Sequence, residues 1–379
     1  MVSIPAAVRE SSGQFIRNAW YVVAWDYEVL DDALFERTIL GESVIVYRAM
    51  DGAPVVMENR CCHRAAPLSL GRKEGDCVRC MYHGLRFDRS GVCVEIPGQA
   101  RIPADARVKI FPAVQRTRLI WVWMGDPLKA DATLIPDTYS VQHPAWASKP
   151  GYKNFGANLL LLADNLLDFA HLSYVHENTL GGSTAIAEAP PVITGLEQRG
   201  IRIVRRVSGV EPAPYHRQLG QFKGLVNRWW DYTLSISGMF IMNSGVQSAH
   251  KSEGDLDGAL LFHSCQALTP ETADSTHYFF SHAHNFAIDD AAVIESIYRS
   301  IVTAFDEDKR MIEAQRFVMA RQPQRPLVGI AADGALVRFR RLFNAALAAE
   351  RNVATERNVA TDASRTRGVE AEEPRGVRD

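Results

Sequence analysis

Two cysteines and two histidines recur as Cys–His pairs in the segment 61–84, CCHRAAPLSLGRKEGDCVRCMYHG. Cys61 and His63 are separated by one residue, and Cys80 and His83 follow with two residues between them. Such a set can bind one zinc ion through two thiolates and two imidazoles. It can equally bind a two-iron, two-sulfur cluster, with the thiolates on one iron and the imidazoles on the other. The spacing alone does not separate these two kinds of metal site.

Three features of this segment favour the cluster over zinc. Each pair joins one cysteine to one histidine, so the same two loops would bind both irons. The surrounding sequence predicts strands, without the helix of a zinc finger. Gly84 directly follows His83, where a backbone that closely approaches bridging sulfides needs a residue without a side chain. We expect the leftover Cys62 and Cys77 to be ordinary small residues near the site, without a disulfide.

A second set of polar residues lies in the stretch 164–177, DNLLDFAHLSYVHE, which contains Asn165, Asp168, His171 and His176. Asp168 and His171 are three positions apart and would share one face of a helix. His176 is five positions beyond His171, so the helix must break or bend if both imidazoles are to reach one metal. Two histidines and one carboxylate on one face of an iron leave three positions open, as in non-haem iron(II) oxygenases.

A third ligand for this iron has to come from further along the chain. The segment FDEDKRMIEAQ contains Asp306, Glu307 and Asp308. Composition does not choose among these three acids, and a charged run on a helix is most often a solvated face. On these grounds the sequence leaves the identity of the carboxylate open.

The bulk properties are those of an ordinary globular protein. The chain has 379 residues, of which 47% are apolar and 23% charged, which suits two domains. A formal net charge of −2 gives no electrostatic reason to expect nucleic acid or an anionic membrane surface as partner. No apolar run approaches a membrane span, and the N-terminus does not resemble a signal peptide. We therefore expect a cytoplasmic protein whose thiols are reduced.

The elements that must position these residues fall into an all-β part and a mixed part. Residues 17–126 predict a β domain, because β-branched and aromatic runs such as AWYVVAW and RLIWVWMG are punctuated by Gly, Asp and Asn. In the second domain, 127–349, the predicted strands are 192–208, 228–242, 258–268 and 276–286. The predicted helices, from apolar spacing of three and four, are 158–176, 289–317 and 335–349. Residues 1–16 are an N-terminal extension, and residues 350–379, which repeat ERNVAT, predict a disordered polar tail.

These motifs resemble those of a known enzyme family. C-x-H followed by C-x-x-H is similar to the Rieske signature, and N-x-x-D-x-x-H-x-x-x-x-H to the mononuclear iron motif of Rieske oxygenases. From residue 15 to about 345 the chain resembles the oxygenase (α) component of Rieske non-haem iron oxygenases, in the branch of vanillate O-demethylase, toluenesulfonate methyl-monooxygenase and dicamba demethylase. FIRNAWYVVAW, EIPGQ, WVWMGDP and TPETADSTHYFF share that likeness.

The resemblance implies an α+β fold, a set of cofactors and their ligands. An all-β Rieske [2Fe-2S] domain would precede a helix-grip (START-like) domain, in which an antiparallel sheet wraps around a long helix. The implied cluster ligands are Cys61, His63, Cys80 and His83. The implied mononuclear Fe(II) ligands are His171, His176 and Asp308, the last because it matches an E-D-x-x-x-x-E context running from Glu307 to Glu313.

The resemblance also implies partners and a reaction. Electrons would come from an NADH-dependent reductase with flavin and plant-type ferredoxin domains. In a head-to-tail homotrimer, Asp168 would link His83 of one subunit to His171 of another. One atom of O₂ would enter a methyl or methoxy group of an aromatic acid, giving an alcohol, or a phenol and formaldehyde. Ring cis-dihydroxylation, a non-catalytic electron carrier and a zinc-stabilised binding protein are the alternatives.

The substrate pocket is the least determined part of the sequence. Relatives commonly have A-R-N-F where this chain has AHNF at 283–286. His282 and His284 would share one face of a strand, and we interpret them as structural or pocket-lining residues rather than as metal ligands. The residues expected to contact substrate are Asn165, Asn243, His263, Gln266, His284 and Arg299.

Overall fold

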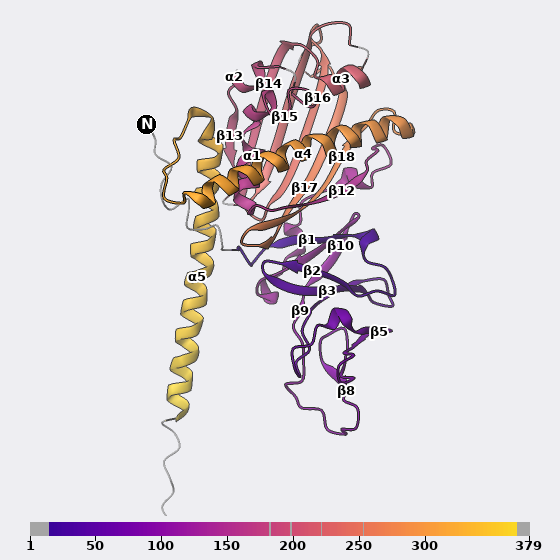
Figure 1. Ribbon diagram of the computed structural model, residues 1–379, viewed down its shortest axis with the longest axis vertical. Coiled ribbons are helices and arrows are strands. Elements are labelled where there is room, and N and C mark those ends of the chain that lie inside the picture. The colour runs from indigo at the N-terminus through magenta and orange to yellow at the C-terminus, as the bar shows by residue number, and fades with distance from the viewer. Residues whose placement is uncertain (1–14, 182, 198, 221, 253, 370–379) are drawn as a thin grey trace, which may run out of the picture.

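The protein is elongated, with a β-rich domain at one end and a mixed domain at the other (Figure 1). The computed structural model describes residues 15–181, 183–197, 199–220, 222–252 and 254–369. The predicted extension at 1–16 therefore lies almost wholly outside the described residues, as does the end of the predicted tail. No helix in the described part of the chain is long and apolar enough to cross a membrane.

Three small antiparallel sheets form the β-rich domain. The first orders its strands as β1 (Trp20–Trp25), β11 (Leu119–Trp123) and β10 (Ala113–Arg116). The second comprises β2 (Phe35–Ile39), β3 (Glu42–Arg48), β4 (Pro54–Glu58) and β9 (Ile110–Phe111). The third comprises β5 (Arg72–Glu74), β6 (Cys77–Arg79), β7 (Arg86–Phe87) and β8 (Cys93–Glu95). The all-β prediction for residues 17–126 is thus confirmed as to fold class.

The mixed domain is built on one seven-stranded antiparallel sheet in the order β12-β18-β17-β16-β15-β14-β13. Its strands are β12 (Pro150–Phe155), β13 (Val192–Gly195), β14 (Gly200–Val210), β15 (Val226–Ser235), β16 (Met239–Ser248), β17 (Leu260–Thr272) and β18 (Ser275–His284). The helices are α1 (Leu159–Leu167), α2 (Ala185–Glu188), α3 (Pro214–Leu219), α4 (Ala291–Arg321) and α5 (Gly334–Val369). Two of the predicted strands, 192–208 and 228–242, are each divided between two antiparallel strands, β13 and β14 in the first and β15 and β16 in the second.

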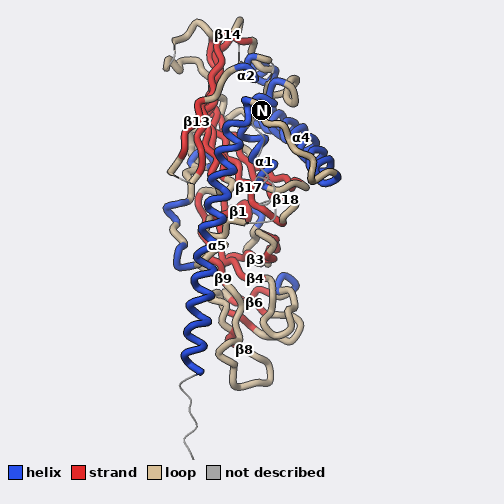
Figure 2. Tube along the Cα trace, turned by 90° about the vertical axis from the view of Figure 1, so that its left-hand side faces the viewer, coloured by secondary structure: helices blue, strands red, loops and turns tan. Residues whose placement is uncertain are grey.

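Both faces of this sheet are covered. Figure 2 shows α1 and α4 along one face, where residues of α1, α4 and α5 share a core with the inward side chains of the strands. On the other face, Trp25, Trp121 and Trp123 of the β-rich domain pack against Met239 and Phe279 of the sheet. β17, in the middle, is therefore buried along most of its length, as a strand covered on both faces should be.

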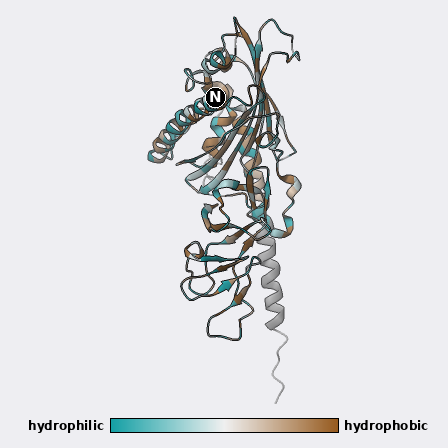
Figure 3. Ribbon diagram, turned by 90° about the vertical axis from the view of Figure 1, so that its right-hand side faces the viewer, coloured by the Kyte–Doolittle hydropathy of each residue, from teal (hydrophilic) through white to brown (hydrophobic). Residues whose placement is uncertain are grey.

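Helix α4 lies across the sheet as the gripped helix of the predicted fold. The Asp290 side chain caps its first turn by accepting from the N–H groups of Ala292 and Val293. Hydrophobic and hydrophilic residues alternate around it in Figure 3. The buried stripe of α4 comprises Ile297, Ile301, Ala304, Phe305, Asp308 and Ile312. These positions recur at intervals of three and four, and one of them is an acid.

Helix α5 is longer than the sequence predicts. The short helix expected at 335–349 continues to Val369, through the first part of the expected disordered tail. Its start is fixed by buried Ala335, Phe339, Phe343 and Leu347. The following residues to 367 contain neither Gly nor Pro, so extending the existing helix costs little, since only initiation is strongly unfavourable. Glu350 also accepts from the N–H groups of Arg17 and Asn18.

Candidate metal centres and active site

The two loops that present Cys61 and Cys80 share one backbone geometry. In each loop the cysteine N–H donates to the carbonyl five residues later, and the cysteine carbonyl accepts from the N–H four residues later, at 2.8–3.0 Å. The residue that makes this second bond has a positive φ in both loops, 56° at Ala65 and 77° at Gly84. Two matching loops can thus present two matching Cys–His pairs to one group between them.

Glycine at position 84 is favoured for a reason the sequence did not show. Its left-handed backbone is one that glycine adopts without strain. A Cβ added at this position would also lie 2.7 Å from Cγ of Pro97. The observed constraint is therefore the φ angle and the neighbouring proline, whereas close approach to sulfides stays a prediction.

The four side chains of these loops differ in exposure by residue type. Cys61 and Cys80 are buried, and His63 and His83 are exposed with ring centroids 4.6 Å apart. Burial raises the pKa of the Cys61 thiol to about 12, and the neighbouring Cys80 adds to the shift. A thiolate is therefore disfavoured at Cys61 unless a metal compensates it. Two inner thiols and two outer imidazoles fit a cluster with one buried and one exposed iron.

The segment that bears the second set of histidines does break before His176, as expected, but the helix already ends before His171. Helix α1 ends at Leu167, Asp168 is extended, and a 3₁₀ turn follows from Phe169 to Ser173. Asp168 therefore does not share a helix face with His171, which corrects that expectation. Its carboxylate caps the turn by accepting from Ala170 N–H, while its backbone carbonyl lies 2.5 Å from Nδ1 of His171. A proton on Nδ1 leaves the Nε2 lone pair of His171 free to bind a metal.

His176 is oriented in the same way by an acid from α4. Its Nδ1 lies 2.8 Å from Oε2 of Glu307, which also accepts from the Thr179 hydroxyl. The chain then turns back, because the N–H of Gly181 donates to the carbonyl of His176. A Cβ at Gly181 would lie 1.8 Å from the carbonyl oxygen of Leu172, so only glycine fits this turn.

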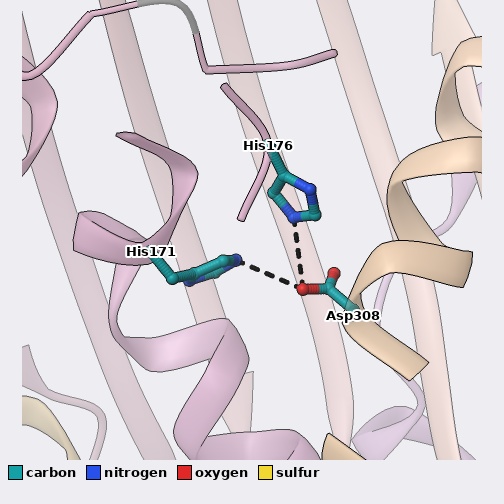
Figure 4. A group of neighbouring side chains, drawn as sticks. All are labelled: His171, His176 and Asp308. Carbon is teal, nitrogen blue, oxygen red and sulfur yellow. Dashed lines mark ion pairs between the residues drawn. The ribbon is translucent and has the colours of Figure 1, made fainter. Parts of the chain in front are cut away.

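Asp308 lies where the two free Nε2 atoms converge (Figure 4). Its Oδ1 is 3.5 Å from Nε2 of His171 and 3.2 Å from Nε2 of His176, and Asn165 donates to the same oxygen at 2.8 Å. Ligand atoms of the three residues lie within 4.8 Å of one another. With both Nδ1 atoms protonated, three acceptors face each other, and a cation between them makes this arrangement favourable.

The local charges agree with a cation site. Burial lowers the pKa of His171, so its imidazole is neutral and able to act as a ligand. Burial alone would raise the pKa of Asp308, but its hydrogen bond with His176 and its electrostatic interactions with the two histidines outweigh burial and lower that pKa. Burial likewise opposes protonation of His176, but Asp308 and Glu307 together raise its pKa. The carboxylates thus give the site an excess of negative charge.

The structure separates the three acids that composition could not. Asp306 is exposed and pairs with Lys153 at 2.6 Å. Glu307 orients His176, and Asp308 alone of the three belongs to the buried stripe of α4. Asp308 is therefore the acid that reaches the two histidines, as the resemblance implied.

A narrow cavity adjoins the three converging residues. Its volume is about 60 Å³. Much of its wall is apolar and aromatic, from Leu166, Phe169, Trp230, Phe240, Met242 and Phe305. Two of the six expected pocket residues line it, Asn165 and Gln266. This cavity is the place where a small aromatic molecule could lie against a metal held by His171, His176 and Asp308.

The other four expected pocket residues lie elsewhere. On β16, Met242 and Ser244 face the cavity, so the intervening Asn243 faces the opposite side. Its cross-strand partner His263 shares that opposite face and lies 2.6 Å from the Ser140 hydroxyl. These two expectations are therefore wrong.

His284 and Arg299 line hollows outside the cavity. His284 is buried, and its Nδ1 lies 2.6 Å from the carbonyl of Phe286. Arg299 is 76% exposed, pairs with Glu295, and lines an outer cleft that shares Tyr215 with the cavity. Neither expectation of direct contact with the inner cavity is confirmed.

Sequence reasoning overlooked Arg228, which lines the cavity, whereas His282, interpreted from the sequence as structural or pocket-lining, also belongs to its wall. Arg228 is 2% exposed and belongs to β15, where buried and partly buried residues alternate. The signal was available, since Arg228 occupies an inward position in the run with Trp230 and Tyr232.

Family comparisons agree with this division of the chain. Residues 19–112 match the Rieske [2Fe-2S] domain, and residues 155–349 match the vanillate O-demethylase oxygenase C-terminal domain. The chain belongs to the Rieske non-haem iron oxygenases. It is an oxidoreductase whose cofactors are a Rieske [2Fe-2S] cluster and a mononuclear non-haem iron.

Individual Rieske oxygenases match over nearly their whole length. The toluene-4-sulfonate monooxygenase system iron-sulfur subunit of Comamonas testosteroni is 45% identical over 89% of this chain and 98% of its own. The vanillate O-demethylase oxygenase subunit of a Pseudomonas species is 33% identical over 83% of this chain and 96% of its own. The crystal structure of dicamba monooxygenase bound to dicamba superposes with a TM-score of 0.80, at 31% identity, over 89% of this chain and 99% of that one.

Proposed function

We propose that this Rieske oxygenase adds one atom of O₂ to a methyl or methoxy group of an aromatic acid, with electrons delivered from NADH by a reductase. The observation that carries the proposal is the convergence of His171, His176 and Asp308 beside a largely apolar cavity. The relatives named for toluene-4-sulfonate, vanillate and dicamba support the substrate class, because each of those compounds is an aromatic acid with a methyl or methoxy group.

The proposed ligands divide between the two domains. Cys61, His63, Cys80 and His83 would bind the cluster, and His171, His176 and Asp308 the iron. The bound metals supply the redox chemistry, since the cluster passes single electrons and the iron centre uses them to activate O₂.

The surrounding residues prepare the iron ligands and the reaction space. The Asp168 carbonyl and the Glu307 carboxylate fix the two imidazole tautomers, and Asn165 holds Oδ1 of Asp308. Phe169, Trp230 and Phe240 contribute an aromatic wall that excludes water and orients a flat substrate. These side chains bind and position, and the metals carry the electron chemistry.

Electron transfer between the two centres is proposed to run between subunits. The cluster loops border the β5–β8 sheet at one end of the molecule, and α1 and α4 lie at the other (Figure 1). A head-to-tail homotrimer would bring His83 of one subunit to Asp168 and His171 of the next. Exposure of His83, and of Met81 and Tyr82 beside it, supports a docking role for this tip, with another subunit or with a reductase bearing flavin and plant-type ferredoxin domains.

The cellular location is proposed from the cysteines. All six are free in the structure, including the exposed Cys62. Free thiols of this kind suit the reducing cytoplasm.

Product analysis with a surrogate reductase and NADH tests the function. The substrate panel is methoxybenzoates, methylbenzoates, toluenesulfonate and phthalate. Formaldehyde with a phenol would establish O-demethylation, and an alcohol without formaldehyde would establish methyl hydroxylation. A diol would contradict the proposal and favour ring cis-dihydroxylation.

The alternative of a pure electron carrier is tested with His171→Ala. An oxygenase loses mononuclear iron and product formation in this variant, while the cluster spectrum persists. The proposal is contradicted if the wild-type protein makes no product and the His171→Ala variant keeps full electron-transfer activity. That result would identify the protein as an electron carrier.

A further inference from the structure

Arg228 is a buried cation without a carboxylate partner among the described residues. Its Nη1 and Nη2 donate to the backbone carbonyls of Gly181 and Leu180 at 2.7 and 2.8 Å. Its Nε is buried and has no hydrogen-bond partner of standard geometry, and the phenol of Tyr215, which interacts with the Arg228 side chain, is kept uncharged because burial raises its pKa. A guanidinium stays charged in a protein interior, and a buried charge without an opposite charge is costly.

The wall of the active-site cavity includes Arg228. Arg228 and Asp308 both line the cavity, and Asp308 is the only acid among its described lining residues. Asp308 is already engaged by His171, His176 and Asn165. No negative charge within the described lining is therefore available to compensate Arg228.

Two buried histidines of this domain also have ring nitrogens without a described partner. His282 lines the same cavity, and its buried Nε2 has no hydrogen-bond partner in the described structure. Burial lowers the pKa of His282 to about 3, so its imidazole is neutral and can still donate one proton. Arg228 and His282 both lie close enough to buried His216 to lower its pKa, after the larger effect of burial. His216 Nδ1 is also without a described partner.

We propose that Arg228 binds the carboxylate or sulfonate of the aromatic acid whose methyl or methoxy group lies at the iron. This inference rests on the proposed function and specifies the site that selects its substrates. A planar guanidinium matches the oxygens of such an anion. The Trp230 ring, with its centroid 4.7 Å from the guanidinium carbon of Arg228, continues the wall towards an aromatic ring.

Arg205 provides a matched control for Arg228. It is also a buried arginine of the sheet, 3% exposed, and its Nη1 donates to the carbonyl of Ile186. Its Nε is likewise without a described partner, but Arg205 is not among the residues that line the cavity. Loss of loop anchoring affects both arginines, whereas anion binding is expected only of Arg228.

The test is calorimetric binding to the purified holoenzyme, without reductase or turnover. The ligands are 4-toluenesulfonate, benzoate and 4-methylbenzoate, each paired with its neutral amide. Wild type is expected to bind an acid at least about tenfold more tightly than its amide. Arg228→Met should weaken acid binding by about a hundredfold and leave the amide unchanged, because it removes one partner of a buried charge pair. Arg205→Met should keep the wild-type preference for acids.

Several outcomes overturn the assignment. They are wild-type binding without preference for acids, failure of all three acids to bind wild type, and equal losses for acid and amide in Arg228→Met. If Arg228→Met does not fold, the proposal is tested with Arg228→Lys and with the preference of the wild type for acid over amide. Lysine keeps the positive charge but lacks the paired N–H donors of the guanidinium, so Arg228→Lys should weaken acid binding about tenfold.

The binding result is separable from the proposed reaction. Acid-selective binding that depends on Arg228, without product from any panel compound, supports the anion site and contradicts the reaction. Product formed equally from acid and amide supports the reaction and contradicts the anion site.

Discussion

Glu307→Gln isolates the contribution of the acid that orients His176. Glu307 does not face the two Nε2 atoms, but its Oε2 lies 2.8 Å from Nδ1 of His176 and also accepts from Thr179. Glutamine keeps the length and one acceptor oxygen but removes the negative charge. The charge-assisted hydrogen bond becomes a neutral one, which is roughly half as strong.

The expected magnitude follows from this contact. Changes to residues that hold metal-binding histidines typically weaken metal affinity by 10- to 100-fold, about 1.4 to 2.8 kcal/mol. Glu307→Gln retains an acceptor and should fall near the tenfold end. Glu307→Ala removes the acceptor from both His176 and Thr179 and should approach the hundredfold end.

The assay is an iron titration of protein stripped of mononuclear iron, with the cluster absorbance as an internal standard. Asp306→Asn is the matched control, because Asp306 is the preceding residue of α4 but pairs with Lys153 at the surface. Its iron affinity should equal that of wild type. Wild-type affinity in both Glu307 variants, or an equal loss in Asp306→Asn, would refute the assigned role of Glu307.

Three other perturbations test the cluster loops and the proposed route between subunits. Gly84→Ala forces a left-handed alanine against Pro97 and should lower the free energy of unfolding by about 1–3 kcal/mol. Ala65→Gly in the matching loop should raise the free energy of unfolding by up to about 1 kcal/mol. Urea denaturation measures both variants, and equal effects would contradict the geometry. Cys80→Ser should abolish the visible cluster spectrum while Cys62→Ser keeps it, and loss in both would contradict the proposed ligands. Asp168→Asn should slow NADH-coupled turnover by about 10- to 100-fold yet retain iron, because the backbone carbonyl that holds His171 is unchanged; wild-type turnover would argue against the inter-subunit link.

The metal-binding motifs could be predicted from sequence because they are local. The five-residue interval between His171 and His176 predicted a break in the helix before His176, and the structure has one, although it comes earlier than expected, at Asp168. The long helix α4 followed from apolar spacing, and its buried stripe includes Asp308. That stripe was present in the sequence, and a search for acids in apolar positions would have favoured Asp308 over Asp306 and Glu307 without any resemblance.

The cavity walls could not be predicted in the same way because they depend on strand register. Successive residues of a strand face opposite sides, so an error of one position moves a side chain to the wrong face. Asn243 and His263 were misplaced for this reason, and both lie opposite the cavity. Gln266 lines the cavity because it pairs with inward-facing Phe240. Only the pairing of β15, β16 and β17 determines these faces.

Asp308 and Arg228, two buried charged residues of the cavity wall, share a physical feature. Asp308 occupies an apolar stripe of α4, and Arg228 occupies an inward position of β15, so each violates the pattern of its own element. Burying either charge costs free energy, and neither is compensated by the other through a described ion pair. A cation beside Asp308 and an anion beside Arg228 would remove both penalties. One aromatic acid, held between the iron and the guanidinium, places its charge at one end and its reactive methyl or methoxy group at the other.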